Sequence, residues 1–170
     1  MILLETPTPV QLRKLEGIAN YQFGRGAGTA LFAKGIRITC SERTGRIRHI
    51  YKNRKLIATL RPKDGYLALT TEGASLILSK TKEHPNLVIA QNDVADFIKA
   101  GGDLFAKHIV RADESLRPAE EAIVTDEGGT LLAVGKAVLS GKDMMCFKRG
   151  VAVRVRRGTN EASEPDQIDL

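Results

Sequence analysis

The feature that most constrains the fold is a change in the spacing of apolar residues along the chain. From Thr8 to Phe23 they recur every three or four positions, and Thr8, Pro9 and Gln11 are typical of a capped helix start. From residue 36 to residue 70 they alternate with polar residues in short runs, separated by the turn sequences RTG, KNRK and PKDG. Helical spacing then returns in TTEGASLILSK. We therefore predict a small α+β domain that contains an antiparallel sheet.

The second half of the chain has a different pattern. Short β runs such as NLVIA, EAIVTD and VAVRVRR alternate with glycine-rich turns, and one early helix ends at Gly101. This pattern predicts a small barrel made mostly of strands. A chain of 170 residues is long enough for two such domains.

Charge divides the chain at the same place. Residues 1–80 carry 14 Lys and Arg against 5 Asp and Glu, whereas residues 81–170 carry 12 against 15. The segment KTKEHPN resembles a linker, and the last ten residues, EASEPDQIDL, hold four acids and no base. We expect one domain over residues 1–82, a second over residues 84–158, and a disordered acidic tail over residues 159–170.

Several classes of function find no support in the sequence. The chain has 2 Cys, far apart, and 3 His without metal-ligand spacing, so we predict no metal site and no cofactor. The adjacent acids Glu120 and Glu121 are expected in a turn, and no catalytic constellation is found. A membrane-spanning apolar run and a signal peptide are both lacking, which predicts a cytoplasmic protein.

The glycine-rich stretch FGRGAG, residues 23–28, could be a phosphate-binding loop or a corner between two helices. It has the spacing of neither a dinucleotide fingerprint nor a P-loop, and it follows a helix. We interpret it as a corner whose glycines allow close helix packing.

Two basic clusters favour a nucleic acid as partner. Between Arg37 and Lys63 there are nine basic residues and one acid, and Arg46 and Arg48 should project from the same face of a strand. In KRGVAVRVRR, alternation predicts that Arg154 and Arg156 point outward. A solvated sheet surface for the first cluster, and a charged edge strand for the second, are the alternatives. With 5% aromatic residues and no Trp, recognition by shape and phosphate contacts fits better than base stacking.

The segment from Asn86 to Gly158 resembles a PUA domain, an RNA-binding module. The resemblance is carried by IKAGGDLFAKHIVRADESLRPAEEAIVTDEGGTLLAVGKAVLSGKDM and by KRGVAVRVRRG. The preceding part, with ANYQFGRGAGTALF and RTGRIRHIYKNRKLIATLRPKDGYLALT, is similar to the domain before PUA in archaeal tRNA-guanine transglycosylase and archaeosine synthase. The resemblance implies an α+β domain followed by a PUA-type β pseudobarrel.

In that family, RNA contacts the first helix of the PUA domain, the glycine loop after it, the next strand and the last strand. Glycines there would let backbone N–H groups approach phosphates, and flanking cations would neutralise charge. Carried over to this chain, the implied RNA-binding residues are Lys99, Gly101, Gly102 and Asp103 in the loop, Lys107 on the strand, and Lys148, Arg149, Gly150, Arg154 and Arg156 at the end. To these we add Arg46 and Arg48 on charge alone.

The resemblance implies an RNA-binding protein, most simply a tRNA-binding one. The large catalytic barrel of the family has no counterpart in this sequence, so we do not expect independent enzymatic activity. Three roles stay open: an accessory protein in tRNA modification, a non-catalytic subunit completing a split transglycosylase or archaeosine synthase, and an RNA-binding factor in translation or ribosome assembly. The partners implied are RNA and, for the second role, a separately encoded tRNA-modifying enzyme.

The division into two domains predicts the outcome of limited proteolysis. Because KTKEHPN is expected to link two separately folded units, a protease at low concentration should cut near His84 and leave two stable fragments. Mass spectrometry of the fragments checks this. Loss of both halves together would show that they unfold as a single unit.

Overall fold

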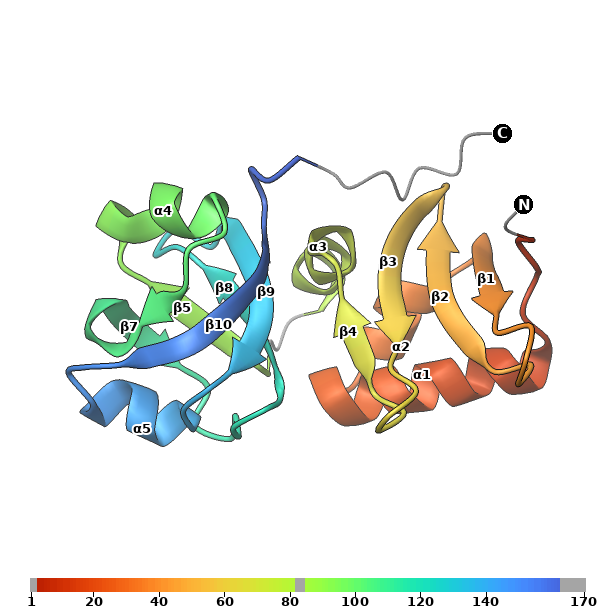
Figure 1. The fold of residues 1–170 in the computed structure, drawn as a ribbon, viewed down its shortest axis with the longest axis horizontal. Coiled ribbons are helices and arrows are strands. Elements are labelled where there is room, and N and C mark those ends of the chain that lie inside the picture. Colours follow the sequence, from red (N-terminus) through yellow and green to blue (C-terminus); the bar gives the residue numbers. More distant parts are fainter. Residues whose placement is uncertain (1–2, 82–84, 163–170) are drawn as a thin grey trace. The chain divides into compact units, whose positions relative to one another are not determined.

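The computed structural model describes residues 3–81 and 85–162, which form two compact units (Figure 1). The first unit contains, in chain order, α1 (Pro9–Phe23), α2 (Ala27–Phe32), β1 (Ile36–Cys40), β2 (Ile47–Lys52), β3 (Lys55–Leu60), β4 (Leu67–Leu69) and α3 (Thr71–Lys80). Its sheet has the order β1-β2-β3-β4, and all neighbours are antiparallel. The predicted helices and antiparallel sheet are confirmed.

Helix α1 begins with the predicted capping box. The Thr8 hydroxyl accepts a hydrogen bond from the Gln11 amide at 3.2 Å, and the Gln11 side chain accepts one from the Thr8 amide at 2.8 Å. Leu15, Ala19 and Phe23 lie on the buried face. The cap satisfies amides that have no partner within the helix, and the buried stripe fixes the helix on the core.

The glycine-rich stretch after α1 is a corner between two helices, as predicted. Gly24 and Gly26 have φ angles of 87° and 91°, which only glycine adopts without strain. A Cβ at Gly28 would lie 2.7 Å from the carbonyl oxygen of Glu16, so glycine allows α1 and α2 to pack closely. The Gly28 amide donates to the side chain of Asn20 at 2.8 Å, which uses an N–H that a phosphate loop would need.

Two loops at one end of the first sheet have the same conformation. In residues 41–46, the Ser41 amide donates to the Arg46 carbonyl at 2.8 Å and the Gly45 amide donates to the Ser41 carbonyl at 2.7 Å. Residues 61–66 repeat the same two bonds at 2.8 and 2.9 Å. The meander topology places both loops at the same end of the sheet, so Arg46 and Tyr66 hold equivalent positions two strands apart.

The second unit is a mixed six-stranded sheet that curves into a barrel-like form. Its elements are β5 (Leu87–Ala90), η1 (Asn92–Val94), α4 (Ala95–Lys99), β6 (Leu104–Phe105), η2 (Ala106–His108), β7 (Ile109–Ala112), β8 (Glu121–Thr125), β9 (Leu131–Ala137), α5 (Gly141–Cys146) and β10 (Val151–Gly158). The strand order is β6-β10-β9-β8-β5-β7, with β5 and β8 parallel. The core is formed by small and branched apolar side chains from every strand. The predicted small β barrel is confirmed.

Three local expectations for the second unit need correction. Glu121 does not lie in a turn: it is the first residue of β8, and it is 1% exposed. Lys107 lies in the 3-10 turn η2 between two strands rather than on a strand. Residues 159–161 are hydrogen-bonded to the barrel rather than free, since the amides of Thr159 and Asn160 donate to Leu132 and Lys99 at 2.9 and 3.0 Å. Residues 163–170 of the predicted tail lie outside the described residues.

No helix among residues 3–81 and 85–162 is both long enough and apolar enough to cross a membrane.

Asp113 fastens the beginning of the second unit. Its carboxylate accepts hydrogen bonds from the Asn86 amide at 2.8 Å and from the Ser115 amide and hydroxyl at 2.9 and 2.8 Å. Partial burial raises the pKa of Asp113, but these bonds to the charged form lower it more, so the net pKa is below its usual value.

This shift predicts how acid destabilises the second unit. Because the folded pKa of Asp113 is depressed, its stabilising contribution is complete above the unfolded pKa of about 4 and is lost as the pH falls through the folded value. Asp113→Asn should therefore lower stability at pH 7 and flatten the fall in stability between about pH 5 and pH 2. Urea unfolding at several pH values measures this. Asp96→Asn, which removes an exposed acid on α4, is the control and should follow the parent curve.

Candidate RNA-binding surface

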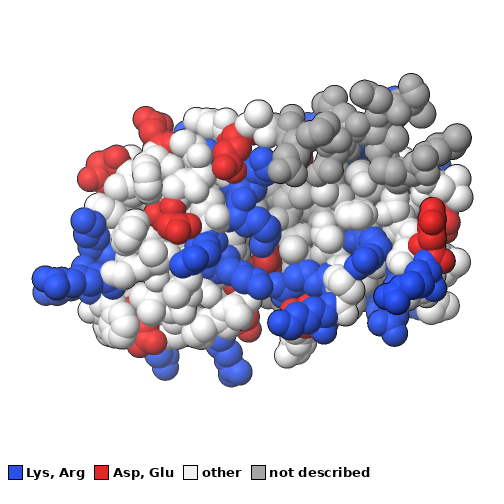
Figure 2. All heavy atoms as spheres, in the orientation of Figure 1, with Lys and Arg blue, Asp and Glu red and all other residues white. Residues whose placement is uncertain are grey.

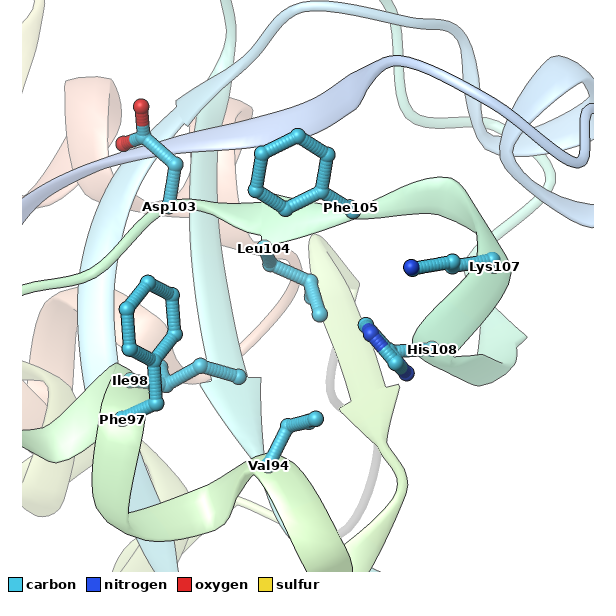
Figure 3. A pocket seen from close by; sticks show the side chains of 8 residues that line it. All are labelled: Val94, Phe97, Ile98, Asp103, Leu104, Phe105, Lys107 and His108. Atoms are coloured by element: carbon cyan, nitrogen blue, oxygen red, sulfur yellow. The ribbon is translucent and has the colours of Figure 1, made fainter.

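A pocket of about 300 Å³ opens on the second unit between α4 and the β6–η2 segment (Figure 3). Ile98 and Leu104, both buried, form its floor. The rings of Phe97 and Phe105 flank it and are 57% and 38% exposed. The complete lining is Val94, Phe97, Ile98, Asp103, Leu104, Phe105, Lys107 and His108. The pocket is thus a mostly apolar recess with a polar rim.

The glycine loop supports Phe97. Gly101 has a φ of 100°, and its amide donates to the Ile98 carbonyl at 2.9 Å, which ends α4. The Gly102 amide donates to the Phe97 carbonyl at 3.0 Å. A Cβ at Gly102 would clash with the Phe97 ring. Glycine at residue 102 therefore leaves the space in which that ring lies.

The same bonds change the predicted role of the loop. The amides of Gly101 and Gly102 were expected to approach phosphates, but both donate to α4 carbonyls. A side chain at Gly101 would also meet the carboxylate of Glu161, which accepts a bond from the Gly158 amide at 2.7 Å. Lys99 is half-buried, and its carbonyl accepts from Asn160 at 3.0 Å. The loop shapes the pocket, and its Gly101 and Gly102 amides are already engaged within the domain.

Asp103 and β6 fix the second aromatic ring. The Asp103 carboxylate accepts a hydrogen bond from the Val155 amide at 2.9 Å, which ties the start of β6 to β10. Phe105 pairs with Val151 of β10, and its neighbours Leu104 and Ala106 are buried. Alternation along the strand therefore turns Phe105 outward. Asp103 has an anchoring role in the fold in addition to lining the pocket.

Cations gather at the η2 side of the pocket. The Ala106 amide donates to the Gly150 carbonyl at 2.9 Å, so the turn carrying Lys148, Arg149 and Gly150 lies beside the segment that carries Lys107. The side chains of Lys107, Lys148 and Arg149 are all exposed. On the face in Figure 2, basic side chains lie in a band over β10 and the turn before it, whereas acidic side chains gather toward α4.

His108 is held at the rim by one neighbour. Its Nδ1 lies 3.2 Å from the Gln91 side-chain oxygen, and its carbonyl accepts from the Gln91 amide at 2.8 Å. The contact fixes the orientation of the His108 ring at the rim.

Arg154 and Arg156, although two residues apart, have different roles. Arg154 is exposed, in register with Lys136 of β9. Arg156 lies in a bulge of β10, and its guanidinium forms a two-point ion pair with Glu121 at 2.9 and 2.7 Å. Arg156 is exposed, like Arg154, but its guanidinium also serves as the charged partner that the buried Glu121 carboxylate needs, so its RNA contact stays a prediction.

Arg46 and Arg48 belong to the first unit. They flank buried Ile47, and only Arg48 lies within β2, so their shared face stays a prediction. The register of β1 with β2 passes from Thr39–His49 to Cys40–Ile47 and so leaves Arg48 in a bulge. Each unit thus carries its own share of the predicted cations.

Three residues that line the pocket are not among the predicted ones. Phe97 and Phe105 are missing because the whole chain is poor in aromatics, and His108 because the histidines lack metal-ligand spacing. Their distribution was the usable signal: Phe23 and Phe32 of the first unit are buried, whereas all three phenylalanines of the second unit are exposed. Among the described residues, no three His, Cys, Asp or Glu side chains are grouped to hold a metal ion.

Comparison with known families agrees with these two units. Residues 13–84 match the patch-forming domain C2 of tRNA-guanine transglycosylase, and residues 86–159 match the PUA domain. The chain is therefore a C2 domain followed by a PUA domain. More particularly, it corresponds to the C-terminal part of the archaeal tRNA-guanine(15) transglycosylases.

Curated relatives show how much of those proteins is represented. The chain is 42% identical over 147 residues to tRNA-guanine(15) transglycosylase of Methanobrevibacter smithii, which covers 86% of this chain and 22% of that protein. The corresponding protein of Pyrococcus abyssi is 40% identical over 157 residues, or 91% of this chain and 26% of the relative. The chain spans about a quarter or less of the length of these relatives.

Solved structures reproduce the fold. A hypothetical protein from Pyrococcus horikoshii OT3 has a TM-score of 0.75 at 22% identity and covers 94% of this chain and 96% of its own. A conserved PUA domain protein from Thermoplasma acidophilum has a TM-score of 0.66 at 22% identity, with 95% of each chain covered. The likeness establishes the architecture of both units.

Substitution of the two arginines of β10 should have unequal effects on stability. Arg156→Ala leaves Glu121, 1% exposed, without its two-point partner and should destabilise the protein by on the order of 2 kcal/mol. This is below the usual cost for a fully buried pair because the Arg156 side chain is 38% exposed. Arg154→Ala should stay within about 0.5 kcal/mol of the parent. Urea unfolding compares the two; the reverse order would mean that the ion pair is not the stabilising contact.

Proposed function

We propose that this protein binds RNA, in particular tRNA, through its PUA domain and has no catalytic activity of its own. It would act in the cytoplasm as an accessory protein in tRNA modification. The observation that carries the proposal is the pocket between Phe97 and Phe105, with exposed cations on one side of it. The names of the relatives, all tRNA-guanine(15) transglycosylases, support tRNA as the RNA.

The pocket suits one unpaired nucleobase. Its volume of about 300 Å³ is at the lower end of the range for small-molecule sites, and both exposed rings can stack on a planar base. Lys107 would contact the sugar or phosphate of that nucleotide, and Lys148 and Arg149 would contact adjacent phosphates. Arg154 would extend the phosphate contacts along β10. Recognition then combines stacking with backbone charge.

A second role has one observation in its favour. The chain spans 22% of the Methanobrevibacter smithii relative, so the remainder of such an enzyme could reside on another polypeptide. The chain would then be the non-catalytic, tRNA-holding subunit of a split tRNA-guanine transglycosylase or archaeosine synthase. Affinity purification from native extract distinguishes the roles: tRNA alone indicates an accessory binder, a catalytic polypeptide indicates a subunit, and a ribosomal subunit indicates a translation factor.

The pocket makes a direct prediction for tRNA binding. Phe97→Ala and Phe105→Ala should each weaken binding of a tRNA transcript by about 5- to 100-fold, since stacking of one base contributes about 1–3 kcal/mol. Fluorescence anisotropy of the full chain measures this. Phe147→Ala is the matched control, because Phe147 is 50% exposed in the same unit but does not line the pocket.

Salt provides the complementary measurement. We expect Lys107, Lys148, Arg149 and Arg154 to contact four phosphates. Raising the salt concentration from 50 to 200 mM should therefore reduce the affinity for tRNA by about 100-fold. Lys148→Ala with Arg149→Ala should flatten this dependence. Equal affinity of the parent, the pocket variants and the charge variants at every salt concentration would refute RNA binding at this surface.

A further inference from the structure

An exposed aromatic pair lies on the first unit, apart from the elements of the PUA domain. Tyr21 of α1 stacks on Tyr66, which precedes β4, with ring centroids 6.1 Å apart and ring planes 7° from parallel. Tyr21 is 78% exposed. A large ring so far in solvent adds little to the core, and its stacking on Tyr66 gives this surface a flat aromatic platform.

The backbone beneath the pair is fixed on both sides. The Gln22 side chain makes two hydrogen bonds to the main chain of Leu67, donating to its carbonyl at 3.1 Å and accepting from its amide at 2.7 Å. The Asp64 carboxylate accepts from the Tyr66 amide at 3.0 Å. The end of α1 is therefore clipped to the start of β4, and the two rings are presented on a preorganised support.

Cations border the pair. In the sheet, Leu60 of β3 pairs with Leu67 of β4, and Thr59 of β3 pairs with His49 of β2. When this register is continued past the strand ends, the Arg61 segment lies between Arg46 on one side and Tyr66 on the other. Neighbouring strands are about 5 Å apart, so Arg46 lies within about 10 Å of the aromatic pair. The same loops carry exposed Arg43 and Lys63. Asp64 is already paired with Arg61 at 3.0 Å, which leaves the excess of charge at this end positive.

We propose that this end of the C2 domain is a second RNA site, at which an unpaired nucleobase stacks on Tyr21 and the adjoining phosphates meet Arg46 and Lys63. An aromatic platform beside cations is the arrangement that binds single-stranded nucleic acid without base-specific contacts. The core of a protein interface is instead depleted of charge, which argues against a protein occupant here. The inference goes beyond the proposed function, because it assigns RNA contact to the other domain and does not depend on the PUA pocket.

A substitution series at Tyr21 tests the stacking. The probe is a ten-nucleotide oligoadenylate, whose binding to the full chain is measured by anisotropy. Tyr21→Ala and Tyr21→Leu should weaken binding by about 5- to 100-fold, while Tyr21→Phe, which keeps the ring, should bind within about twofold of the parent. At 78% exposure, none of these changes should alter the thermal unfolding midpoint. Arg46→Ala should weaken binding and reduce its salt dependence.

The outcomes separate this site from the PUA pocket. If Tyr21→Leu binds as well as the parent and only Tyr21→Ala is weak, the face requires apolar area rather than stacking, and the proposal is overturned. If all Tyr21 variants bind like the parent while Phe97→Ala is weak in the same assay, the second site is wrong and the PUA site stands. If Tyr21→Ala changes only the sedimentation behaviour of the protein, the face joins polypeptides instead of RNA, which also overturns the proposal.

Discussion

Strand β10 is the element on which the second unit depends. It pairs with β9 on one side and with the short β6 on the other, so it carries β6 and its exposed ring into the sheet. A bulge at Arg156 interrupts the pairing of β10 with β9. Gly135 of β9 permits the bulge, because a Cβ there would clash with the Arg154 carbonyl. The two acids that meet the bulge, Asp103 and Glu121, then hold β6 and β8 to it.

This use of acids shapes the electrostatics of the candidate surface. Asp103, Glu121 and Glu161 all lie near the predicted RNA-binding residues, and each accepts hydrogen bonds within the domain. Their negative charge partly offsets the cations around them. Because Arg156 is paired with Glu121, the positive field of the surface comes mainly from the exposed cations Lys107, Lys148, Arg149 and Arg154. Such a field can attract a phosphate backbone, and the exposed rings beside it offer surfaces on which bases can stack.

Most of the fold could be predicted from the sequence because local and global preferences agree. The capping box of α1, the alternation in β1 to β3 and the glycine corner each depend on neighbours in sequence, and each formed as expected. Errors arose where partners far apart in sequence decide the outcome. Arg156 and Glu121 are 35 residues apart, and no local pattern pairs them. The hydrogen bonds from the Gly101 and Gly102 amides to α4 carbonyls were also not apparent from the sequence.

The candidate site was predictable in place but not in chemistry. The family resemblance directed attention to α4 and the segment after it, which line the pocket, and the cations that it implied are exposed apart from Lys99, which is half-buried. Composition then misled, because an overall aromatic content of 5% conceals where the rings lie. An aromatic content averaged over the whole chain does not distinguish buried rings from exposed ones. The alternation of buried and exposed positions at Leu104, Phe105 and Ala106 would have indicated that the Phe105 ring is exposed.

Both units hold aromatic rings that are exposed to water. Burying a phenylalanine stabilises a protein by about 1.5–3 kcal/mol relative to leaving it in water, so rings at Phe97 and Phe105 contribute far less to folding than they could. Each has a structural support that keeps it in place: Gly102 leaves room for the first, and pairing with Val151 turns the second outward. Tyr21 is likewise held by the clip between Gln22 and Leu67. A fold that fixes flat apolar surfaces in water, each near cations, has the chemistry to bind partners that are planar and anionic at once. Unpaired nucleotides have both properties, which duplex RNA does not offer because its bases are already stacked.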